Sequence, residues 1–268
     1  MNRIDQTFTQ LGESGRKALI PFITAGDPTP AFTVETMHAL VEAGADVIEL
    51  GVPFSDPMAD GPVIQRASER ALANKVNLRQ VIDFVRQFRN TNQQTPVVLM
   101  GYLNPIECMG YEQFVSAAKD AGVDGVLTVD MPPEEAEDLS KRLHDADIAC
   151  IFLLAPNSNS ERVRKVSGIG RGYLYYVSLK GVTGASHLDL EEVERKIGQI
   201  RENTSLPIVV GFGVKDPETA ASIGRVADGV VVGSALISRI ESSLELTEPE
   251  IRQQITVLLA SMREALDN

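Results

Sequence analysis

The sequence has few of the residues that build disulfide frameworks and metal centres: two cysteines and three histidines among 268 residues, and no tryptophan. The cysteines are far apart without metal-type spacing, so we interpret Cys108 and Cys150 as reduced thiols. The histidines are scattered at His38, His144 and His187, which does not predict a zinc site. We therefore expect a chemistry that uses no protein-bound metal.

Long apolar runs and an excess of positive charge are also missing. No run approaches the roughly 18 apolar residues of a membrane span, and residues 1–11 contain no signal-peptide core, so we expect a cytoplasmic protein. Lys and Arg number 25 against 37 Asp and Glu, a formal net charge of −12, which argues against binding to a nucleic-acid backbone. An anionic ligand would have to be held by local groups.

Several catalytic signatures are lacking as well. No Gly-x-Gly-x-x-Gly motif opens a helix after the first predicted strand, and no nucleophile elbow is present. Lys180 comes nearest to a Schiff-base lysine, but it falls in a polar loop, where an ammonium group is usually solvated. Acid–base chemistry by carboxylates remains as the best-supplied mechanism.

What the sequence does contain is a regular alternation of apolar strands and amphipathic helices. Hydrophobic residues make up 43% of the chain and charged residues 23%, enough for a large core. Strands are predicted at 18–24, 47–50, 96–101, 125–129, 148–154, 173–178, 207–211 and 229–232. Helices are predicted at 2–11, 29–42, 63–73, 78–88, 111–121, a charged segment ending at 144, 160–166, 189–200, 217–223, 234–240 and 249–265.

This alternation predicts an α/β protein with about eight βα units of roughly 30 residues, the length and count of a (β/α)8 TIM barrel. The segment 2–11 would be an extra N-terminal helix, and 234–240 a short phosphate-binding helix after the eighth strand. No linker divides the chain, so we expect residues 1–268 to form one domain. A doubly wound open sheet is the alternative architecture.

Three predicted helix-to-strand joints resemble one another. In residues 43–48, 121–126 and 226–231, a small residue and an Asp precede a β-branched strand. We interpret the likeness as a repeated αβ joint geometry and do not infer an internal duplication from it.

Two acidic residues mark the second predicted strand and the loop after it. Glu49 interrupts an otherwise apolar strand, where a carboxylate is costly unless it is paired, solvated or functional. Asp60 follows in an Asp-Gly-Pro turn. In a parallel α/β fold both belong at the face where active sites form. A Lys or Arg partner for Glu49 and ordinary turn chemistry for Asp60 are the structural alternatives.

The last two units carry a phosphate-binding pattern. The seventh strand runs into Gly211-Phe212-Gly213, and the eighth into Gly233-Ser234 at the start of a short helix. Glycines let backbone N–H groups approach phosphate oxygens, and the dipole of a helix favours an anion at its N-terminus. This pattern predicts a phosphate site at the end of the barrel that also holds the two acids.

The sixth strand and the loop after it supply further candidates. Tyr173 and Tyr175 share one face of the strand, either as barrel filling or as ligand contacts. Residues 178–186 form a small, polar loop that is a candidate lid. From this loop Thr183 and Gly184 could reach the phosphate.

Taken together, four segments resemble the tryptophan synthase α-subunit family. They are Pro21-Phe-Ile-Thr-Ala-Gly-Asp-Pro28, the segment from Leu50 to Pro62 with its Gly-Val-Pro-Phe-Ser-Asp-Pro and Ala-Asp-Gly-Pro motifs, Gly181-Val-Thr-Gly184 and Gly211-Phe-Gly213. The resemblance spans essentially the whole chain in order and spacing, and the second segment is the most specific. One departure is Ser178-Leu179-Lys180, where known members have Ser-Arg-Ser.

The resemblance implies a metal-free retro-aldol lyase that cleaves indole-3-glycerol phosphate to indole and glyceraldehyde 3-phosphate. Glu49 would be the general acid and later the base, while Asp60 would accept the indole N–H. Burial in the strand is expected to raise the pKa of Glu49 relative to that of Asp60. An α2β2 complex is implied, in which indole passes to a β subunit that carries pyridoxal phosphate. No cofactor is expected in this chain.

The family's other site residues fall on definite positions of this sequence. The indole site would be lined by Phe22, Tyr102, Leu127 and Tyr175, with Thr183 on the closing loop contacting Asp60. The phosphate would be held by Gly184, Phe212, Gly213, Gly233 and Ser234. The surface facing the β subunit would include Pro53, Phe54, Ser55, Asp56, Asn104, Pro105 and Pro132.

Two other functions stay open on the sequence. One is a different phosphosugar isomerase or aldolase on the same barrel, with Glu49 as its base. The other is a non-catalytic subunit that binds a phosphorylated ligand and only regulates a partner.

Overall fold

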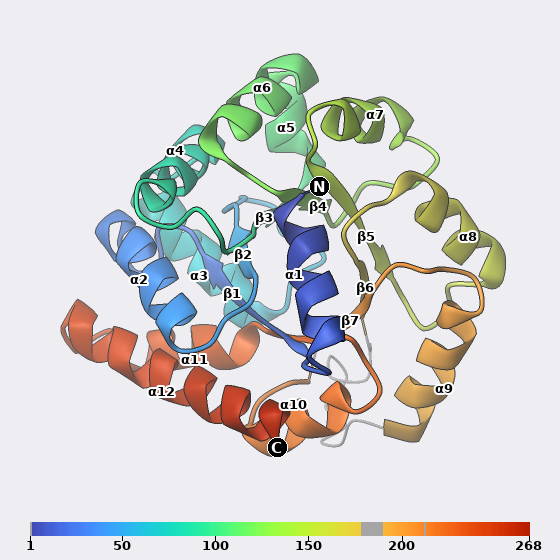
Figure 1. Ribbon diagram of the computed structural model, residues 1–268. Coiled ribbons are helices and arrows are strands. Elements are labelled where there is room, and N and C mark those ends of the chain that lie inside the picture. Colours follow the sequence, from blue (N-terminus) through green and yellow to red (C-terminus); the bar gives the residue numbers. More distant parts are fainter. Residues whose placement is uncertain (1, 178–189, 212) are drawn as a thin grey trace.

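The computed structural model describes residues 2–177, 190–211 and 213–268 (Figure 1). Its strands form a closed barrel in sequence order, with every neighbouring pair parallel and β1 beside β8. The predicted (β/α)8 barrel is therefore confirmed, and the open sheet is excluded. The strands are β1 (Ala18–Thr24), β2 (Ile48–Gly51), β3 (Val97–Gly101), β4 (Gly125–Thr128), β5 (Ala149–Leu154), β6 (Leu174–Val177), β7 (Ile208–Gly211) and β8 (Gly229–Val232).

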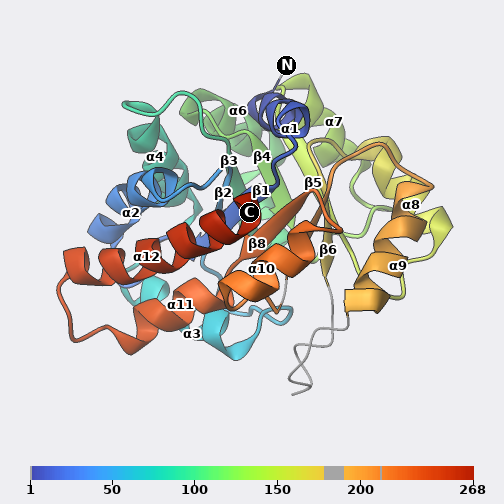
Figure 2. The ribbon, with the colours of Figure 1, turned by 60° about the horizontal axis from the view of Figure 1, so that its bottom comes forward.

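Helices surround the barrel (Figures 1 and 2). Their buried apolar residues belong to the same core cluster as those of the strands. Each strand is therefore buried on two faces, one toward the barrel interior and one toward the helices, which explains why most strands are continuous apolar runs in the sequence. The helices are α1 (Arg3–Glu13), α2 (Pro30–Glu42), α3 (Pro62–Ala73), α4 (Leu78–Arg89), α5 (Leu103–Met109), α6 (Tyr111–Ala121), α7 (Glu137–Asp145), α8 (Ser160–Ile169), α9 (Leu190–Arg201), α10 (Pro217–Gly224), α11 (Ser234–Ser242) and α12 (Glu248–Asp267).

Helix α1 covers the amino-terminal end of the barrel, as the view down the barrel shows (Figure 1). Its Ile4 is fully buried, and the Asn2 side chain before it donates to the carbonyl oxygens of Asp124 and Asp147, at 2.8 and 2.7 Å. Both carbonyls lie just before strands. Because α1 occupies this end, a substrate must enter from the carboxyl ends of the strands.

One predicted strand end and one segment without a predicted element differ from the structure. Gly51 belongs to β2, where it pairs with Thr24 and Met100, whereas we expected it to end the strand. The segment Leu103–Met109 is helix α5, which the sequence did not suggest because Asn104-Pro105 is typical of a turn. Proline is tolerated there because the N–H groups of a first helical turn have no partner within the helix.

The three similar joints have the same function in the structure. The carboxylates of Asp46, Asp124 and Asp228 each accept from the first or second backbone N–H of the preceding strand, at 2.8 Å in all three cases. Each carboxylate is also paired with an arginine: Arg263, Arg89 and Arg201, respectively. The repeated Asp therefore joins neighbouring strands at the closed end of the barrel.

Among these joints Asp124 is the most buried, with its side chain 3% exposed beside an Arg89 that is 7% exposed. We expect Asp124→Ala to lower the free energy of unfolding by about 3–5 kcal/mol, since it leaves the Arg89 guanidinium buried without its counter-charge. Urea unfolding measures this loss. The matched change Asp228→Ala removes a more exposed pair and should cost about 1–2 kcal/mol. Equal losses in the two variants would contradict the argument from burial.

No helix among residues 2–177, 190–211 and 213–268 is long and apolar enough to cross a membrane. The cytoplasmic location stays a prediction.

Candidate active site

The carboxylate of Glu49 lies inside the barrel and is completely buried. Its Oε1 accepts a hydrogen bond of 2.6 Å from the Tyr173 hydroxyl, and its Oε2 has no partner among the described residues. No Lys or Arg of the described chain pairs with it. The alternative that Glu49 is a structural residue paired with a Lys or Arg is therefore not supported among the described residues.

Tyr173 lies directly before β6 and is also completely buried. Its ring packs against Phe8 of α1, with the ring centroids 5.7 Å apart. The hydroxyl at the other end of the ring thus contacts Glu49 from the side of the amino-terminal end of the barrel, which α1 covers. Tyr173 thus fills the barrel interior, as one of the two interpretations held, and its hydroxyl is satisfied by a candidate catalytic acid.

Burial raises the pKa of Glu49 from its ordinary 4.5 to about 7, because desolvation penalises the charged form more than the Tyr173 hydrogen bond favours it. A carboxyl group with this pKa is protonated and ionised in comparable amounts near neutral pH. It can therefore both donate and accept a proton there.

The second acid, Asp60, is positioned by Tyr102 at the start of α5. The Tyr102 hydroxyl donates to Asp60 Oδ2 at 3.1 Å and accepts from the backbone N–H of Ala59 at 3.0 Å. The Gln65 amide donates to the Asp60 carbonyl oxygen at 2.8 Å. Asp60 therefore has more than a turn role, because a tyrosine on the next βα loop fixes its side chain.

Burial also raises the pKa of Asp60, from its ordinary 3.8 to about 6, again against a weaker opposing hydrogen bond from Tyr102. The expected order is thus present, with the pKa of Glu49 above that of Asp60. Between these two values Asp60 is mostly ionised while Glu49 keeps much of its proton. Two carboxyls whose environments separate their pKa values are typical of an acid–base pair.

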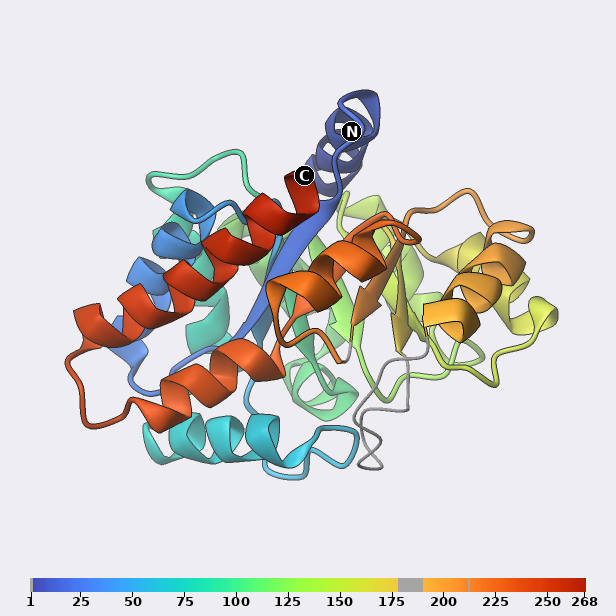
Figure 3. The ribbon, with the colours of Figure 1, turned by 90° about the horizontal axis from the view of Figure 1, so that it is seen from below.

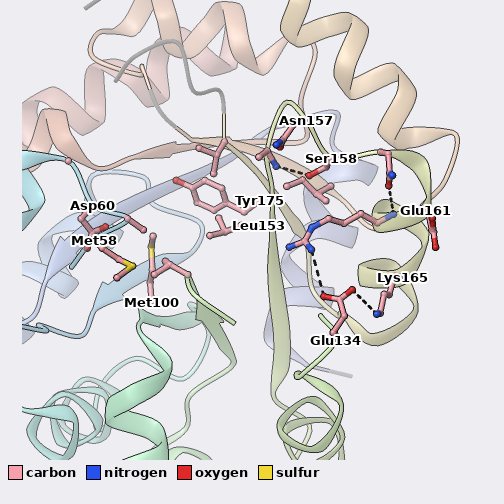
Figure 4. A pocket seen from close by; sticks show the side chains of 18 residues that line it. Met58, Asp60, Met100, Glu134, Leu153, Asn157, Ser158, Glu161, Lys165 and Tyr175 are labelled. Atoms are coloured by element: carbon pink, nitrogen blue, oxygen red, sulfur yellow. Dashed lines mark hydrogen bonds and ion pairs between the residues drawn. The ribbon is translucent and has the colours of Figure 1, made fainter. Parts of the chain in front are cut away.

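A cavity of about 1150 Å³ opens beside these residues (Figure 4). Asp60, Met100 and Tyr175 line one end, and Glu134 with its ion-pair partners Arg162 and Lys165 lines the other. Glu49 itself is not among the described side chains that line it. A smaller cavity, of about 20 Å³, is lined by Phe22, Asp60 and Tyr102 together with other residues.

Tyr175 explains the glycine at the end of β7. A Cβ atom on Gly211 would lie 1.8 Å from the Tyr175 hydroxyl oxygen, so any larger residue would displace the ring from the barrel interior. We had interpreted Gly211 as part of the phosphate pattern. In the structure its contact is with Tyr175, which has an exposed fraction of 4%.

Of the predicted phosphate residues, Gly213, Gly233 and Ser234 are described, and they lie at the same end of the barrel as Asp60. Gly233 is the N-cap of α11, which has no side-chain cap, and Ser234 is its first residue. Gly213 has φ of +81°, a conformation that favours glycine. Because α11 begins at the carboxyl end of β8, the free N–H groups of its first turn lie at the open end of the barrel. Thr183, Gly184 and Phe212 lie outside the described residues.

The remaining predicted residues lie on neighbouring elements. Leu127 is fully buried in β4 and, with Tyr102, lines a third small cavity; its contact with indole stays a prediction. Phe54 stacks on Tyr102 with ring centroids 5.1 Å apart. The residues expected to face a partner lie on loops and helix starts at the carboxyl ends of β2, β3 and β4: Pro53, Phe54, Ser55, Asp56, Asn104, Pro105 and Pro132.

Comparison with known proteins decides the family. A family model described as "Tryptophan synthase alpha chain" matches residues 8–267. The chain belongs to this family. The tryptophan synthase alpha chain of Methylococcus capsulatus is 66% identical over 267 residues, covering 100% of both chains, and that of Ralstonia nicotianae is 59% identical with the same coverage.

Solved structures agree with this assignment. The tryptophan synthase subunit alpha of Legionella pneumophila is 49% identical with a TM-score of 0.93, covering 100% of this chain and 99% of that one. A chain of the aminoacrylate-bound tryptophan synthase from M. tuberculosis is 32% identical with a TM-score of 0.87, covering 99% and 100%. The chain is thus the lyase subunit that acts on indole-3-glycerol phosphate in tryptophan biosynthesis, and the two alternative functions are not favoured. The family also implies a β-subunit partner.

Two features of the site were not found from the sequence. The hydrogen bond from Tyr173 to Glu49 joins residues 124 positions apart, and no local pattern pairs them. Asp130 accepts from the Leu103 N–H at 2.8 Å and so holds the start of α5 beside Tyr102. An Asp directly after the predicted strand 125–129 was the available signal, but its partner depends on how α5 packs.

The contact between Tyr173 and Glu49 gives a test by pH. In Tyr173→Phe the charged form of Glu49 loses its hydrogen bond, so the pKa of Glu49 should rise further. We expect the alkaline limb of the kcat/KM profile for indole release to move to higher pH, with the maximal rate within about tenfold of wild type. Tyr111→Phe, which removes a surface Tyr–Glu hydrogen bond, should leave the profile in place. A downward movement of the limb would contradict the proposed link.

Proposed function

We propose that Glu49 and Asp60 carry out the retro-aldol cleavage in this chain. Glu49, protonated, delivers its proton to indole C3, which places a positive charge on the ring nitrogen. Asp60, ionised, accepts the indole N–H and stabilises that charge. Glu49, now a carboxylate, takes the proton of the substrate hydroxyl as the aldehyde forms, the carbon–carbon bond breaks and its electrons return to the ring. One proton leaves Glu49 and one returns, so the residue ends as it began.

The observation that carries this proposal is the fully buried carboxyl of Glu49 and the half-buried carboxyl of Asp60, whose pKa values are raised to about 7 and about 6. Neither has a cationic partner among the described residues. A structural role would be served by an ion pair, as at Asp124, and would not need an uncompensated acid in the barrel. Membership of the family supports the same assignment.

Because Glu49 does not line the large cavity, we propose that its side chain rotates toward the substrate when the site fills. Its unpartnered Oε2 is free to make the contact, while Oε1 is held by Tyr173. Phe22, Leu127 and Tyr175 would pack against the indole. The phosphate would lie on the backbone N–H groups near Gly213, Gly233 and Ser234, with Thr183, Gly184 and Phe212 completing its site.

We also propose that the chain works in an α2β2 complex and hands indole to the pyridoxal-phosphate site of the β subunit. The proposed contact surface consists of Pro53, Phe54, Ser55, Asp56, Asn104, Pro105 and Pro132. Phe54, stacked on Tyr102, would couple this surface to Asp60. No cofactor is proposed for this chain itself, and its single continuous core supports one domain over residues 1–268.

The decisive experiment is an indole-release assay with indole-3-glycerol phosphate. We expect indole and glyceraldehyde 3-phosphate in equal amounts from the purified chain. The rate should increase when a β subunit is added, because a partner that binds the active arrangement more tightly raises its population. No indole with or without the β subunit would contradict the proposal.

A further inference from the structure

Helices α3 and α11 lie side by side at the carboxyl-end face of the barrel (Figure 3). They are joined by Glu241 on α11. Its carboxylate accepts two hydrogen bonds of 2.7 Å from Arg66 and one of 2.9 Å from Arg70, both on α3. The two helices are therefore bound by a charge network in addition to their apolar contact.

Arg70 extends this network to the loop after β1. Its guanidinium donates to both carboxylate oxygens of Asp27, at 2.6 and 3.0 Å, and the Asp27 side chain is 0% exposed. One turn further along α3, the Asn74 amide donates to the carbonyl oxygens of Gly26 and Pro28, at 3.1 and 2.7 Å. Arg70 thus links β1, α3 and α11 through a fork geometry that lysine cannot reproduce.

The other ends of these helices carry the proposed site. Helix α3 begins two residues after Asp60, and Gln65 in its first turn donates to the Asp60 carbonyl oxygen at 2.8 Å. Helix α11 begins at Ser234, in the proposed phosphate site. Because helices are stiff, the place where Arg70 joins them sets the position of Asp60 relative to Ser234.

We propose that Arg70 is a positioning residue, which through Asp27 and Glu241 holds Asp60 at the distance from the phosphate site that one substrate molecule requires. This inference rests on the proposed roles of Asp60 and Ser234. Arg70 does not line the cavity that holds Asp60. Its effect would come from the alignment of the groups that bind the two ends of the substrate, and not from contact with the substrate. Misplacement of a catalytic group by about 1 Å can cost about 10²-fold in rate.

The test separates alignment from general damage by measuring the two ends independently. In Arg70→Gln we expect kcat/KM for indole release to fall by about 10- to 100-fold, while the Kd for glycerol 3-phosphate, which probes the phosphate end alone, stays within about twofold. Arg86→Gln removes an exposed Arg–Asp pair on α4 and should change neither quantity. Glu241→Gln, which removes the negative charge between α3 and α11 but leaves their apolar contact and the Asp27–Arg70 pair, should reduce kcat/KM in the same way.

Unchanged kcat/KM in Arg70→Gln, or a parallel loss of glycerol 3-phosphate affinity, would overturn the positioning role. If that variant does not fold, Glu241→Gln decides by the same two readouts. Asp60→Asn is assayed alongside: if it keeps wild-type activity, the proposed function fails, whereas an inactive Asp60→Asn with an unaffected Arg70→Gln refutes the positioning inference alone.

Discussion

Glu49→Gln is expected to lower kcat for indole release by about 10³- to 10⁴-fold, since the same side chain is proposed to act as acid and as base. Glutamine keeps the shape of the side chain and its ability to accept from Tyr173, but it cannot deliver a proton to indole C3. KM should change little because the phosphate end is untouched. Steady-state indole release measures both quantities.

The same substitution should increase stability at neutral and alkaline pH. The pKa of Glu49 is raised from 4.5 in the unfolded chain to about 7 in the folded one, so the folded state binds more protons between these values. Stability of the wild type is therefore lost as the pH rises from about 4.5 to about 7. Glutamine does not titrate, and we expect Glu49→Gln to exceed the wild type by about 3 kcal/mol at pH 8 and by much less at pH 4.

The control for both effects is Glu264→Gln, the same change on the exposed side of α12. It should alter neither kcat nor the pH dependence of unfolding. If Glu49→Gln turned over substrate at a rate near that of the wild type, Glu49 would have no proton-transfer role.

Asp60→Asn is expected to lower kcat by about 10²- to 10³-fold, the usual cost of removing one preorganised charge-stabilising group. Asparagine keeps the size of the side chain but loses the negative charge that faces the developing charge on the indole ring. In the wild type, activity should fall as the pH drops below about 6, because Asp60 becomes protonated. This acidic limb should be absent from the variant, whereas the limb near pH 7 that belongs to Glu49 should stay.

Asp83→Asn is the matched control, since Asp83 lies exposed on α4 and pairs only with surface groups. It should show the wild-type profile with both limbs. An acidic limb that persisted in Asp60→Asn would mean that another group titrates there, and a rate within a few-fold of wild type would exclude Asp60 from charge stabilisation.

Much of the barrel was predictable because its signals are local. Apolar runs of four to seven residues marked the strands, and Thr29-Pro30 or Asp216-Pro217 marked helix starts that the structure confirms with side-chain caps. Helix α5 was missed because proline in a first turn and proline in a loop have the same local sequence. The recurring Asp at three joints was visible in the sequence, but its hydrogen bond to a backbone N–H of the neighbouring strand was not.

The chemical nature of the site also followed from local sequence: a carboxylate in an apolar strand, a second one in the next loop, and glycines at the ends of the last two strands. The partners of these groups came from closure of the barrel. Tyr173 reaches Glu49, Tyr102 reaches Asp60, and Arg70 joins Asp27 to Glu241 across separations of 42 to 171 residues. The order of residues along the chain does not reveal the distance between such groups, because that distance depends on how the eight strands and their helices pack together. The same packing determines how far each carboxyl is desolvated, and so how far its pKa is raised.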